Sequence, residues 1–426
     1  MIWLYRILFL PLLIVTLPYY LKRMFKRGGY IRDFHHRFGL IGSPGPKNPQ
    51  VKRIWLQAVS VGEVQAISSL LEALEARDDV EVILTTTTST AYKIARERYS
   101  KITLRTGTFP LDFWPFSVLA WRQLQPDLCL LMEGELWPEH IHQAHRRGVP
   151  IMLINARLSN RSFSRYKKAS WIAKGLLRKL DKLLASSQYD LDRYLAVGAN
   201  PATSTVTGNI KFDVAQGPNL SEEEKAALKA ELGFAKDDLV LLGSSTWDGE
   251  EAMLIDTLQQ ALLRDLPCRL LLCPRHSERR KAIIALCKAA GLSWHLRTDA
   301  KQAPDNTRIY IADTTGELKR LTQICDLAFV GKSLAPNKGG QTPIEAAAAG
   351  KAVVYGPDMS NFGPICRSLK DAQAALQVSD KDQAEQTLLD LLEHTNKRAA
   401  LANKAAQWHT QNQGATQRTL ESIDLG

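Results

Sequence analysis

The sequence lacks the short motifs that mark several common classes of protein. Its six cysteines form no CxxC pair, which argues against a cysteine-built zinc or redox site and favours buried thiols. RNP, KH and zinc-finger signatures are absent, so nucleic acid is the weakest partner for a chain with a net charge of +11. Low-complexity tracts are also absent, and 45% of the residues are hydrophobic. The 426-residue chain is therefore expected to fold into two or three ordered domains and to bind no nucleic acid.

An uncharged apolar run, ILFLPLLIVTLPYYL, occupies residues 7–21. No small-residue cleavage motif follows it, which argues against a removed signal peptide. The run is shorter than the roughly 20 residues of a transmembrane helix, but flanking aromatic and basic side chains can extend it. Because the heavier basic cluster, at 22–27, follows the run, the positive-inside rule predicts a cytoplasmic body. Residues 1–45 are thus predicted to be a membrane anchor, spanning or interfacial, with a basic linker; a buried first helix is the alternative.

From residue 46 onward, short apolar runs alternate with amphipathic helical patterns, which predicts parallel sheets covered by helices on both faces. A first domain at 46–209 has expected strands at 54–59, 80–88, 127–133, 149–155, 181–187 and 204–209. After a linker at 210–220, a second domain at 221–380 has expected strands at 238–245, 268–274, 307–313, 326–331 and 351–356. Residues 381–426 are expected to be helices that pack on either domain.

The first strand-to-helix loop carries Ser60, Gly62 and Glu63. Ligands of doubly wound sheets bind at the carboxyl ends of the strands, and two such domains are expected to face a cleft. The spacing S-x-x-E is that of a capping box, in which Glu63 closes the start of a helix. Alternatively, Gly62 lets a ligand approach and Glu63 acts as a general base. Both interpretations stay open on the spacing alone.

The strand at 127–133 ends in MEGELWP, with two carboxylates around a glycine. A helix start accounts for Glu135 and the proline. It does not account for Glu133 at the end of an apolar strand, so we predict a functional role for Glu133. Trp137 follows in the same loop and, with Gly62 and Glu135, is a candidate for acceptor binding.

The loops of the second domain suit an anionic nucleotide. Ser245 and Thr246 follow one strand, and Arg275 and His276 follow the next. The glycine pair Gly339-Gly340 leads into an alanine-rich helix with Glu345 one turn in, a pattern that can cradle phosphate and hold ribose hydroxyls. Ordinary helix caps and close packing are the alternatives.

The basic segment at 155–179 interleaves Arg and Lys with aromatic residues, a composition that suits an anionic lipid surface. Arg157 and Arg161 are its candidates for acceptor binding. A solvated basic helix is the alternative. Asp190 and Asp192 have the form of a metal-binding DxD, but they open a predicted helix, and we expect no metal there.

Taken together, these loops resemble the 3-deoxy-manno-octulosonic acid (Kdo) transferases, membrane-associated glycosyltransferases of lipopolysaccharide biosynthesis. The resemblance extends from the N-terminal apolar run to about residue 365. The motifs that carry it, in order, are AVSVGEVQA, PLDFWPF, PDLCLLMEGELWP, INARLSNRSFSRY, VTGNIKFD, SSTWDGEE, PRHSER, DTTGEL and GGQTPIEAAAAGKAVVYGP.

The resemblance implies a GT-B fold of two Rossmann-like domains, with CMP-Kdo held mainly by the second domain and a lipid A precursor, lipid IVA, by the first. It implies that Glu63 is the catalytic base of an inverting transfer at the cytoplasmic face of the bacterial inner membrane. No metal and no cofactor are expected. With the loop arguments above, it gives catalytic roles to Glu63 and Glu133. The expected donor-binding residues are Lys211, Ser245, Thr246, Arg275, His276, Gly316, Glu317, Gly339, Gly340 and Glu345.

The chain departs from the family pattern on the donor side. Trp247 and Gln341 stand where the family usually has histidine, and Lys332 stands where it usually has glycine. Gly134 and Ala346 replace a usual threonine and proline. These departures keep two alternatives open: another GT-B enzyme that uses a UDP-sugar, and a catalytically weak membrane-bound protein that binds a nucleotide-sugar.

Overall fold

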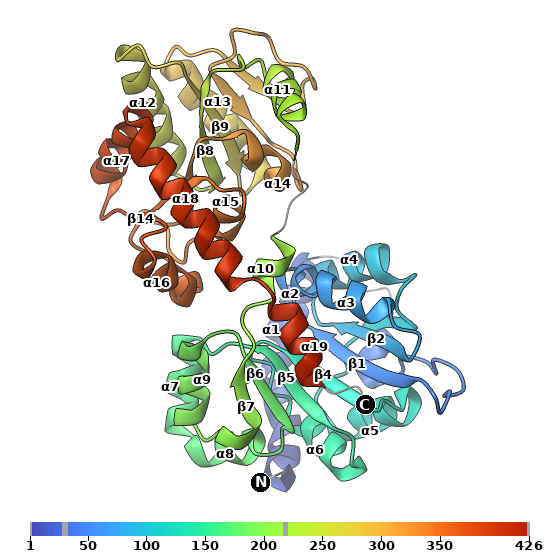
Figure 1. The fold of residues 1–426 in the computed structure, drawn as a ribbon. Coiled ribbons are helices and arrows are strands. Elements are labelled where there is room, and N and C mark those ends of the chain that lie inside the picture. Colours follow the sequence, from blue (N-terminus) through green and yellow to red (C-terminus); the bar gives the residue numbers. More distant parts are fainter. Residues whose placement is uncertain (1, 28–32, 216–219, 424–426) are drawn as a thin grey trace. The chain divides into compact units, whose positions relative to one another are not determined.

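The computed structural model describes residues 2–27, 33–215 and 220–423 (Figure 1). Its contacts divide the chain into two compact units. Unit 1 comprises Met1–Val214 and Gln413–Gly426, and unit 2 comprises Ala215–Asn412. The chain therefore leaves the first unit, builds the second and returns to the first. Each unit contains one seven-stranded sheet, which confirms the predicted α/β class.

The sheet of unit 1 is parallel throughout. Its strands are β1 (Lys52–Ala58), β2 (Val80–Thr86), β3 (Arg105–Thr108), β4 (Leu128–Met132), β5 (Ile151–Ala156), β6 (Lys182–Ala185) and β7 (Ser204–Val206). They are hydrogen-bonded in the order β3-β2-β1-β4-β5-β6-β7. Along β1, Ile54 and Leu56 pack into one hydrophobic core and Trp55 into another. Both faces of the sheet are thus buried, which explains why its strands read as continuous apolar runs.

Helices cover both faces of this sheet. They are α1 (Ile2–Arg27), the 3₁₀ helix η1 (Phe34–Phe38), α2 (Val61–Ala66), α3 (Ser68–Glu75), α4 (Ser89–Tyr99), α5 (Trp114–Leu124), α6 (Pro138–Arg147), α7 (Asn160–Lys168), α8 (Ser170–Leu177), α9 (Gln188–Ala196), η2 (Pro201–Thr203), α10 (Lys211–Val214) and α19 (Ala415–Ile423). Asp190 lies in the first turn of α9, where its carboxylate accepts from Ser187. The helix start predicted for this acid is confirmed.

The C-terminal helix α19 belongs to unit 1. Asp213 accepts the backbone N–H groups of Gly414 at 2.7 Å and Thr416 at 2.6 Å. Ala415 and Ile423 are buried in the same core as Ile54 and Leu56. The last residues of the chain therefore complete the core of its first unit.

Unit 2 repeats the architecture. Its strands are β8 (Leu239–Thr246), β9 (Cys268–Pro274), β10 (Trp294–Leu296), β11 (Ile309–Ile311), β12 (Leu327–Val330), β13 (Ala352–Tyr355) and β14 (Leu376–Gln377). They pair in parallel in the order β10-β11-β9-β8-β12-β13-β14. Its helices are α11 (Glu222–Glu231), α12 (Glu250–Leu263), η3 (Ser277–Arg279), α13 (Arg280–Ala289), α14 (Leu318–Leu321), η4 (Thr322–Ile324), α15 (Ile344–Ala348), η5 (Ser360–Phe362), α16 (Gly363–Asp371), α17 (Lys381–Glu393) and α18 (Thr395–Asn412).

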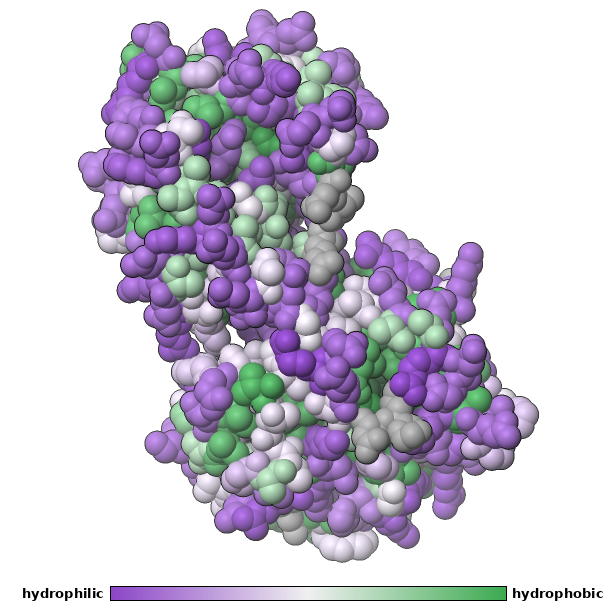
Figure 2. Space-filling model, viewed as in Figure 1, coloured by the Kyte–Doolittle hydropathy of each residue, from purple (hydrophilic) through white to green (hydrophobic). Residues whose placement is uncertain are grey.

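The N-terminal helix α1 differs from the other helices because most of its apolar side chains at residues 2–19 are exposed. It is the one helix of the described chain that is long and apolar enough to cross a membrane. On the face that Figure 2 shows, hydrophilic residues dominate the surface of each unit, and smaller apolar areas are scattered among these hydrophilic residues. The predicted N-terminal apolar helix is present.

Candidate active site

In each sheet, one pair of central strands marks the point where the winding reverses. The pair is β1 and β4 in unit 1 and β8 and β12 in unit 2. Ligands of open parallel sheets bind outside the carboxyl ends of the strands at such a point. The loop after β1 carries Glu63, and the loop after β4 carries Glu133 and Glu135. The topology thus brings together the acids that the sequence singled out in unit 1.

Glu63 folds back on the start of its own helix, α2. Ser60 caps this helix by accepting the N–H of Glu63. In return, the Ser60 hydroxyl donates to Glu63 Oε1 at 2.8 Å and the N–H of Val59 donates to Oε2 at 2.8 Å. The residue is 6% exposed. The capping role predicted from S-x-x-E is therefore present, whatever else Glu63 does.

The surroundings of Glu63 raise its pKa to about 7. Burial is the main cause, and the nearby charge of Glu133 adds to it. The two hydrogen bonds from its own turn and the charge of Lys211 act in the opposite direction. A carboxylate with this pKa can accept a proton near neutral pH and release it again, as a general base must.

Glu133 lies at the end of β4 with a positive φ of 55°, a conformation that costs free energy in a residue with a side chain. Lys211 Nζ donates to its Oε1 at 2.7 Å, and Arg157 Nη1 donates to the same atom at 3.4 Å. Burial alone would raise the pKa of Glu133, but the charges of Lys211 and Arg157 outweigh burial and lower it. Glu133 therefore stays ionised between two cations.

Glu135 is the third acid of the carboxylate cluster formed with Glu63 and Glu133. Burial, followed by the charges of Glu63 and Glu133, raises its pKa to about 7. Its carboxylate forms no hydrogen bond or ion pair with the described residues. The group therefore holds one acid that stays ionised and two whose charge changes near neutrality. Such a separation of pKa values is typical of sites that move protons.

Three further candidates of unit 1 differ in their surroundings. Gly62 is exposed, and a Cβ atom there would meet only Ser60 Oγ, at 4.0 Å. The ring of Trp137 is tilted on that of Phe109 at 5.5 Å, and its buried N–H has no hydrogen-bond partner among the described residues. Arg161 is exposed on the first turn of α7, and no contact within the described chain joins it to the carboxylates.

Lys211 lies in unit 1, at the start of α10, although the resemblance implied a role in donor binding. Asn155 helps to position it, since its Oδ1 accepts the N–H of Ile210 at 3.3 Å. Asn155 is fully buried at a positive φ of 48°. Asn155 lies within the motif INARLS and had no predicted role. The sequence feature that could have indicated a role for Asn155 is a lone amide side chain at the end of an apolar strand.

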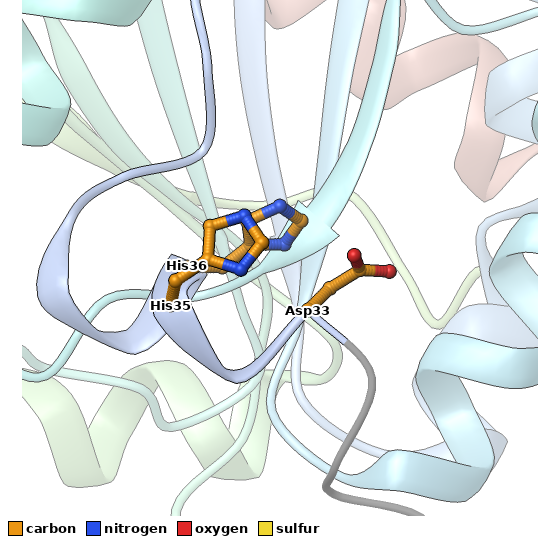
Figure 3. Close-up of side chains that lie close together, drawn as sticks. All are labelled: Asp33, His35 and His36. Carbon is orange, nitrogen blue, oxygen red and sulfur yellow. The ribbon is translucent and has the colours of Figure 1, made fainter.

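One group of side chains in the described chain has a geometry that could hold a metal ion. Asp33, His35 and His36, around η1, place possible ligand atoms within 4.8 Å of one another (Figure 3). Tyr92 donates to Asp33 Oδ2 at 2.7 Å, and the N–H of Thr108 donates to His36 Nδ1 at 3.2 Å. Burial lowers the pKa of His36 to about 4. These bonds tie η1 to its neighbours, and we assign no metal to the group.

In unit 2, a buried carboxylate organises the loops after β8 and β12. Glu250 is 1% exposed. It accepts the backbone N–H groups of four residues, which are Trp247 at 2.9 Å, Lys332 at 2.8 Å, Ser333 at 2.9 Å and Leu334 at 3.2 Å. Glu250 was not among the predicted site residues, because spacing alone cannot distinguish it from an ordinary helix-start acid.

The residues held by this loop pair form a basic and aromatic surface. Lys332 Nζ lies 4.7 Å from the centre of the Trp247 ring, and the Trp247 and His276 rings are 5.0 Å apart. Arg275 is exposed beside them, with its N–H bonded to Thr246 O at 3.1 Å. Thr246 Oγ is buried with no hydrogen-bond partner in the described chain. This surface can bind an anion.

Ser245 and Lys332 both adopt positive φ, at 54° and 60°. Ser245 is the last residue but one of β8, and Lys332 follows β12 as Glu133 follows β4 in unit 1. Strained residues of this kind gather at functional sites, which supports the same location in both sheets.

Gly316 and Glu317 lie in the loop after β11. Gly316 has a positive φ of 91°. Arg297 Nη2 donates to Glu317 Oε1 at 2.7 Å, and the Thr314 hydroxyl also donates to this carboxylate. Although burial acts in the opposite direction, these bonds lower the pKa of Glu317. Its carboxylate is thus already ionised and bound within its own loop.

The glycine pair does not form the phosphate cradle expected from the sequence. The N–H of Gly339 donates to Asp358 Oδ1 at 3.0 Å, and the N–H groups of Gly340 and Gln341 donate to backbone carbonyls. A Cβ at Gly340 would lie 2.3 Å from Met359 Sδ. The glycines therefore allow a tight loop. The helix that follows, α15, has only five residues, and Glu345 lies in its first turn.

Comparisons with known proteins agree on one family. Residues 32–214 match the family model described as 3-deoxy-D-manno-octulosonic-acid transferase (kdotransferase). The 3-deoxy-D-manno-octulosonic acid transferase of Bordetella pertussis is 35% identical, over 91% of this chain and 90% of that protein. The enzyme of the same name from Haemophilus influenzae is 33% identical, over 97% of this chain and 94% of that protein. This chain belongs to the Kdo transferase family. It is a glycosyltransferase, as the sequence motifs predicted.

Solved structures support the fold of this Kdo transferase. The UDP-GlcNAc 2-epimerase of Neisseria meningitidis, bound to UDP-GlcNAc, matches with a TM-score of 0.60 over 87% of this chain and 99% of that one, at 13% identity. Anabaena Alr3699/HepE in complex with UDP matches with a TM-score of 0.59 over 87% and 98%, at 17% identity. At this identity the likeness concerns the fold alone, which is the predicted GT-B class.

The structure gives this Kdo transferase a physical account of two departures from the family pattern. Trp247 and Lys332, which the resemblance marked as departures from the expected motifs, contact each other through the cation–π pair. Lys332 has a positive φ, the conformation that a glycine expected at this position would adopt without strain. Together the two substitutions place a lysine charge over an indole ring.

Proposed function

We propose that this Kdo transferase moves Kdo from CMP-Kdo to a hydroxyl group of a lipid A precursor, with inversion at the anomeric carbon. The proposal rests on the cluster of three acids in unit 1, Glu63, Glu133 and Glu135. Glu63 and Glu135 have pKa values raised to about 7, whereas Glu133 is kept ionised by Lys211 and Arg157. A transferase that activates a hydroxyl needs a base of this kind beside the acceptor.

In the proposed reaction, the acceptor oxygen attacks the anomeric carbon of Kdo from the face opposite CMP. The new C–O bond forms as the bond to the CMP phosphate breaks, and CMP leaves with the electron pair. The hydroxyl proton passes to Glu63. The anomeric carbon is fully substituted, so positive charge develops on it before the acceptor bond is complete. These bond changes and the proton transfer balance without any other reactant.

Glu133 and Lys211 have a supporting role in this proposal. Because Glu133 stays ionised, its charge raises the pKa of Glu63 and makes it a stronger base. The Lys211 ammonium, 2.7 Å from Glu133 Oε1, limits that rise. The pair therefore sets the proton affinity of Glu63 near neutral pH.

The proposed donor site is the basic and aromatic surface of unit 2. Arg275, Lys332 and His276 offer positive or hydrogen-bonding groups to the CMP phosphate and to the Kdo carboxylate. The unpartnered hydroxyl of Thr246 is a further candidate donor of a hydrogen bond. Positive charge at this position stabilises the departing CMP.

The proposed place of the reaction is the cytoplasmic face of the bacterial inner membrane. The exposed apolar helix α1 supports a membrane anchor, as do the basic residues that follow it. The basic helix α7, with Arg165, Lys167 and Lys168 in its last turn, suits an anionic lipid headgroup.

A comparison of Glu63→Gln with Glu135→Gln tests the proposal. Transfer is measured with CMP-Kdo and a lipid A precursor in vesicles, product configuration by NMR, and binding of CMP-Kdo and of UDP-sugars by calorimetry. We expect Glu63→Gln to bind CMP-Kdo normally and to lose about 100- to 10,000-fold in kcat, whereas Glu135→Gln loses less.

Two results would overturn the assignment. Near-normal turnover of Glu63→Gln with a large loss in Glu135→Gln would make Glu135 the base. Retention of the anomeric configuration, or binding of a UDP-sugar in preference to CMP-Kdo, would reject the proposed reaction itself.

A further inference from the structure

The first two turns of α1 are bound to unit 1 through a charged pair. Arg6 donates twice to Glu139 at the start of α6, from Nε to Oε2 at 2.9 Å and from Nη2 to Oε1 at 2.8 Å. The Glu139 side chain is fully buried and that of Arg6 is 10% exposed. Two parallel bonds between a guanidinium and a carboxylate fix orientation as well as position.

Two further contacts join the same part of α1 to unit 1. The Tyr5 hydroxyl donates to Asp112 Oδ2 at 2.6 Å, and Asp112 also accepts the N–H groups that open α6. The Phe9 ring stacks on Phe113, with 5.1 Å between centroids and 9° between planes. We call these contacts of Tyr5, Arg6 and Phe9 the α1 latch.

Most of the other apolar side chains among residues 2–19 of α1 are exposed. Ile7 is 68% exposed, Ile14 67% and Val15 77%. The other large apolar residues exposed on this helix are Trp3, Leu4, Leu8, Leu10, Leu12, Leu17 and Tyr19. An apolar surface of this size on one helix, followed by basic residues at 22–27, matches the interior and the anionic surface of a lipid layer.

Although α1 as a whole is long and apolar enough to cross a membrane, the uncharged run within it is shorter than the hydrocarbon core. The 15 uncharged residues between Arg6 and Lys22 would extend about 22 Å, against about 30 Å for the hydrocarbon core. In a spanning helix, Tyr5 and Arg6 would also lie across the membrane from Asp112 and Glu139. The α1 latch could not form.

The chain returns to unit 1 soon after α1. Asp33 accepts from Tyr92, and the Arg37 guanidinium donates to the carbonyl groups of Phe109 and Thr87. Residues 5–9 contact the segments that follow β3 and β4, and residues 33–37 contact the segments that follow β2 and β3. Because the residues before and after the apolar run are bound to the same unit, we expect them to lie on the same side of the membrane.

We infer that α1 is an interfacial segment, latched to unit 1 at its N-terminal end and inserted by its apolar side chains into one leaflet of an anionic bilayer. The inference deepens the proposed function, on which its choice of a lipid surface rests. Glu139 follows Trp137 by two residues and Glu133 by six. The latch therefore holds the leaflet beside the loop proposed to receive the lipid acceptor.

A crosslink between positions 9 and 113 tests this topology. The double variant Phe9→Cys/Phe113→Cys is bound to vesicles of phosphatidylethanolamine and phosphatidylglycerol, floated, and treated with a short bifunctional maleimide. All six native cysteines are buried, so background reaction is low. We expect the protein to float with the vesicles and the linked peptide to be found by mass spectrometry. Val15→Cys/Phe113→Cys, with its cysteine in the lipid-facing part, should give no link.

Removal of the charged contact supplies the second arm. Arg6→Ala should lower the yield of the 9–113 link about tenfold, because charge-assisted hydrogen bonds to Glu139 are lost. Arg6→Lys should recover part of it. Flotation without the link would show a spanning or detached helix and overturn the inference, and failure to float would reject the lipid surface. Neither readout depends on Kdo transfer, so failure of the proposed reaction is recognised separately.

Discussion

The two units have the same sheet topology and opposite chemistry at the same place. In unit 1, the loops after the central strands β1 and β4 bring three carboxylates together, and two of them have pKa values raised to about 7. In unit 2, the loop after β9 presents Arg275 and His276, and the loop after β12 presents Lys332. A buried carboxylate there, Glu250, is held by four backbone N–H groups.

The difference shows that burial of an acid does not by itself indicate catalysis. Burial raises the pKa of both Glu63 and Glu250. Glu250 gives all of its hydrogen-bonding capacity to the backbone and therefore holds two loops together. Glu63 accepts only two bonds and lies beside other acids. The number and kind of its partners distinguish a structural acid from a candidate base.

The largest effect on stability is expected from Glu250→Gln. The amide leaves two of the four N–H groups without an acceptor, which should lower the free energy of unfolding of unit 2 by about 3 kcal/mol or more. Asp248→Asn is the control, because the Asp248 side chain is 88% exposed. Urea denaturation measures both. Equal stability of the two variants would contradict the structural role of Glu250.

The pH dependence of unit 1 is the next effect in size. The pKa values of Glu63 and Glu135 are raised from 4.5 to about 7 in the folded state, so the folded state binds more protons than the unfolded state between these values. Stability should therefore fall as pH rises through this window, by about 1 to 3 kcal/mol for each group. Urea denaturation between pH 4 and pH 8 should show a flatter profile for Glu63→Gln/Glu135→Gln, and an unchanged slope would refute the pKa assignment.

The same titration predicts the pH profile of the reaction. Glu63 must be deprotonated to act as a base, so kcat/KM should rise as pH increases through about 7 and then level off. Lys211→Met should move the midpoint upward, because the charge of Lys211 lowers the pKa of Glu63. A profile that is flat from pH 5 to pH 8 would exclude Glu63 as the base.

The substitution Gly62→Ala tests whether a ligand approaches the backbone of unit 1 at this position. The space around Gly62 is open, so alanine should stabilise α2 by about 0.5 to 1 kcal/mol. If the acceptor approaches there, kcat/KM should nevertheless fall about tenfold. Gly363→Ala in unit 2 is the matched control, since a Cβ there would meet nothing within 4 Å. Unchanged kinetics in both variants would show that Gly62 is not part of the acceptor site.

The smallest expected effect concerns Lys332. Lys332→Gly and Lys332→Met should each raise the KM for CMP-Kdo about two- to fivefold, because both remove one half-exposed positive charge. Only glycine also relieves the positive φ of 60°. A change of KM in the glycine variant alone would trace the effect to the backbone.

Much of the fold could be predicted from the sequence because central parallel strands are buried on both faces and form apolar runs. The prediction missed β3, β10 and β14, all at sheet edges. β3 reads Arg-Thr-Gly-Thr, and the other two have three and two residues. Edge strands need fewer apolar residues, so hydrophobic periodicity does not detect them.

The candidate site could be predicted only as separate loops. The motifs indicated Glu63, Glu133 and Glu135, but the pairing of Glu133 with Lys211 joins residues 78 positions apart. The four bonds of Glu250 likewise depend on a loop more than 80 residues away. Such contacts follow from strand order, which a single sequence does not specify. The unit to which α19 belongs was left open for the same reason.

The return of α19 to unit 1 has a consequence for biosynthesis. The hydrogen bonds to Asp213 cannot form until Gly414 and Thr416 have been synthesised. The core around Ile54 and Leu56 is likewise incomplete without Ala415 and Ile423. During translation, the ribosome therefore releases all of unit 2 before it releases the helix that closes unit 1. The half of the protein that is made first is the last to be finished.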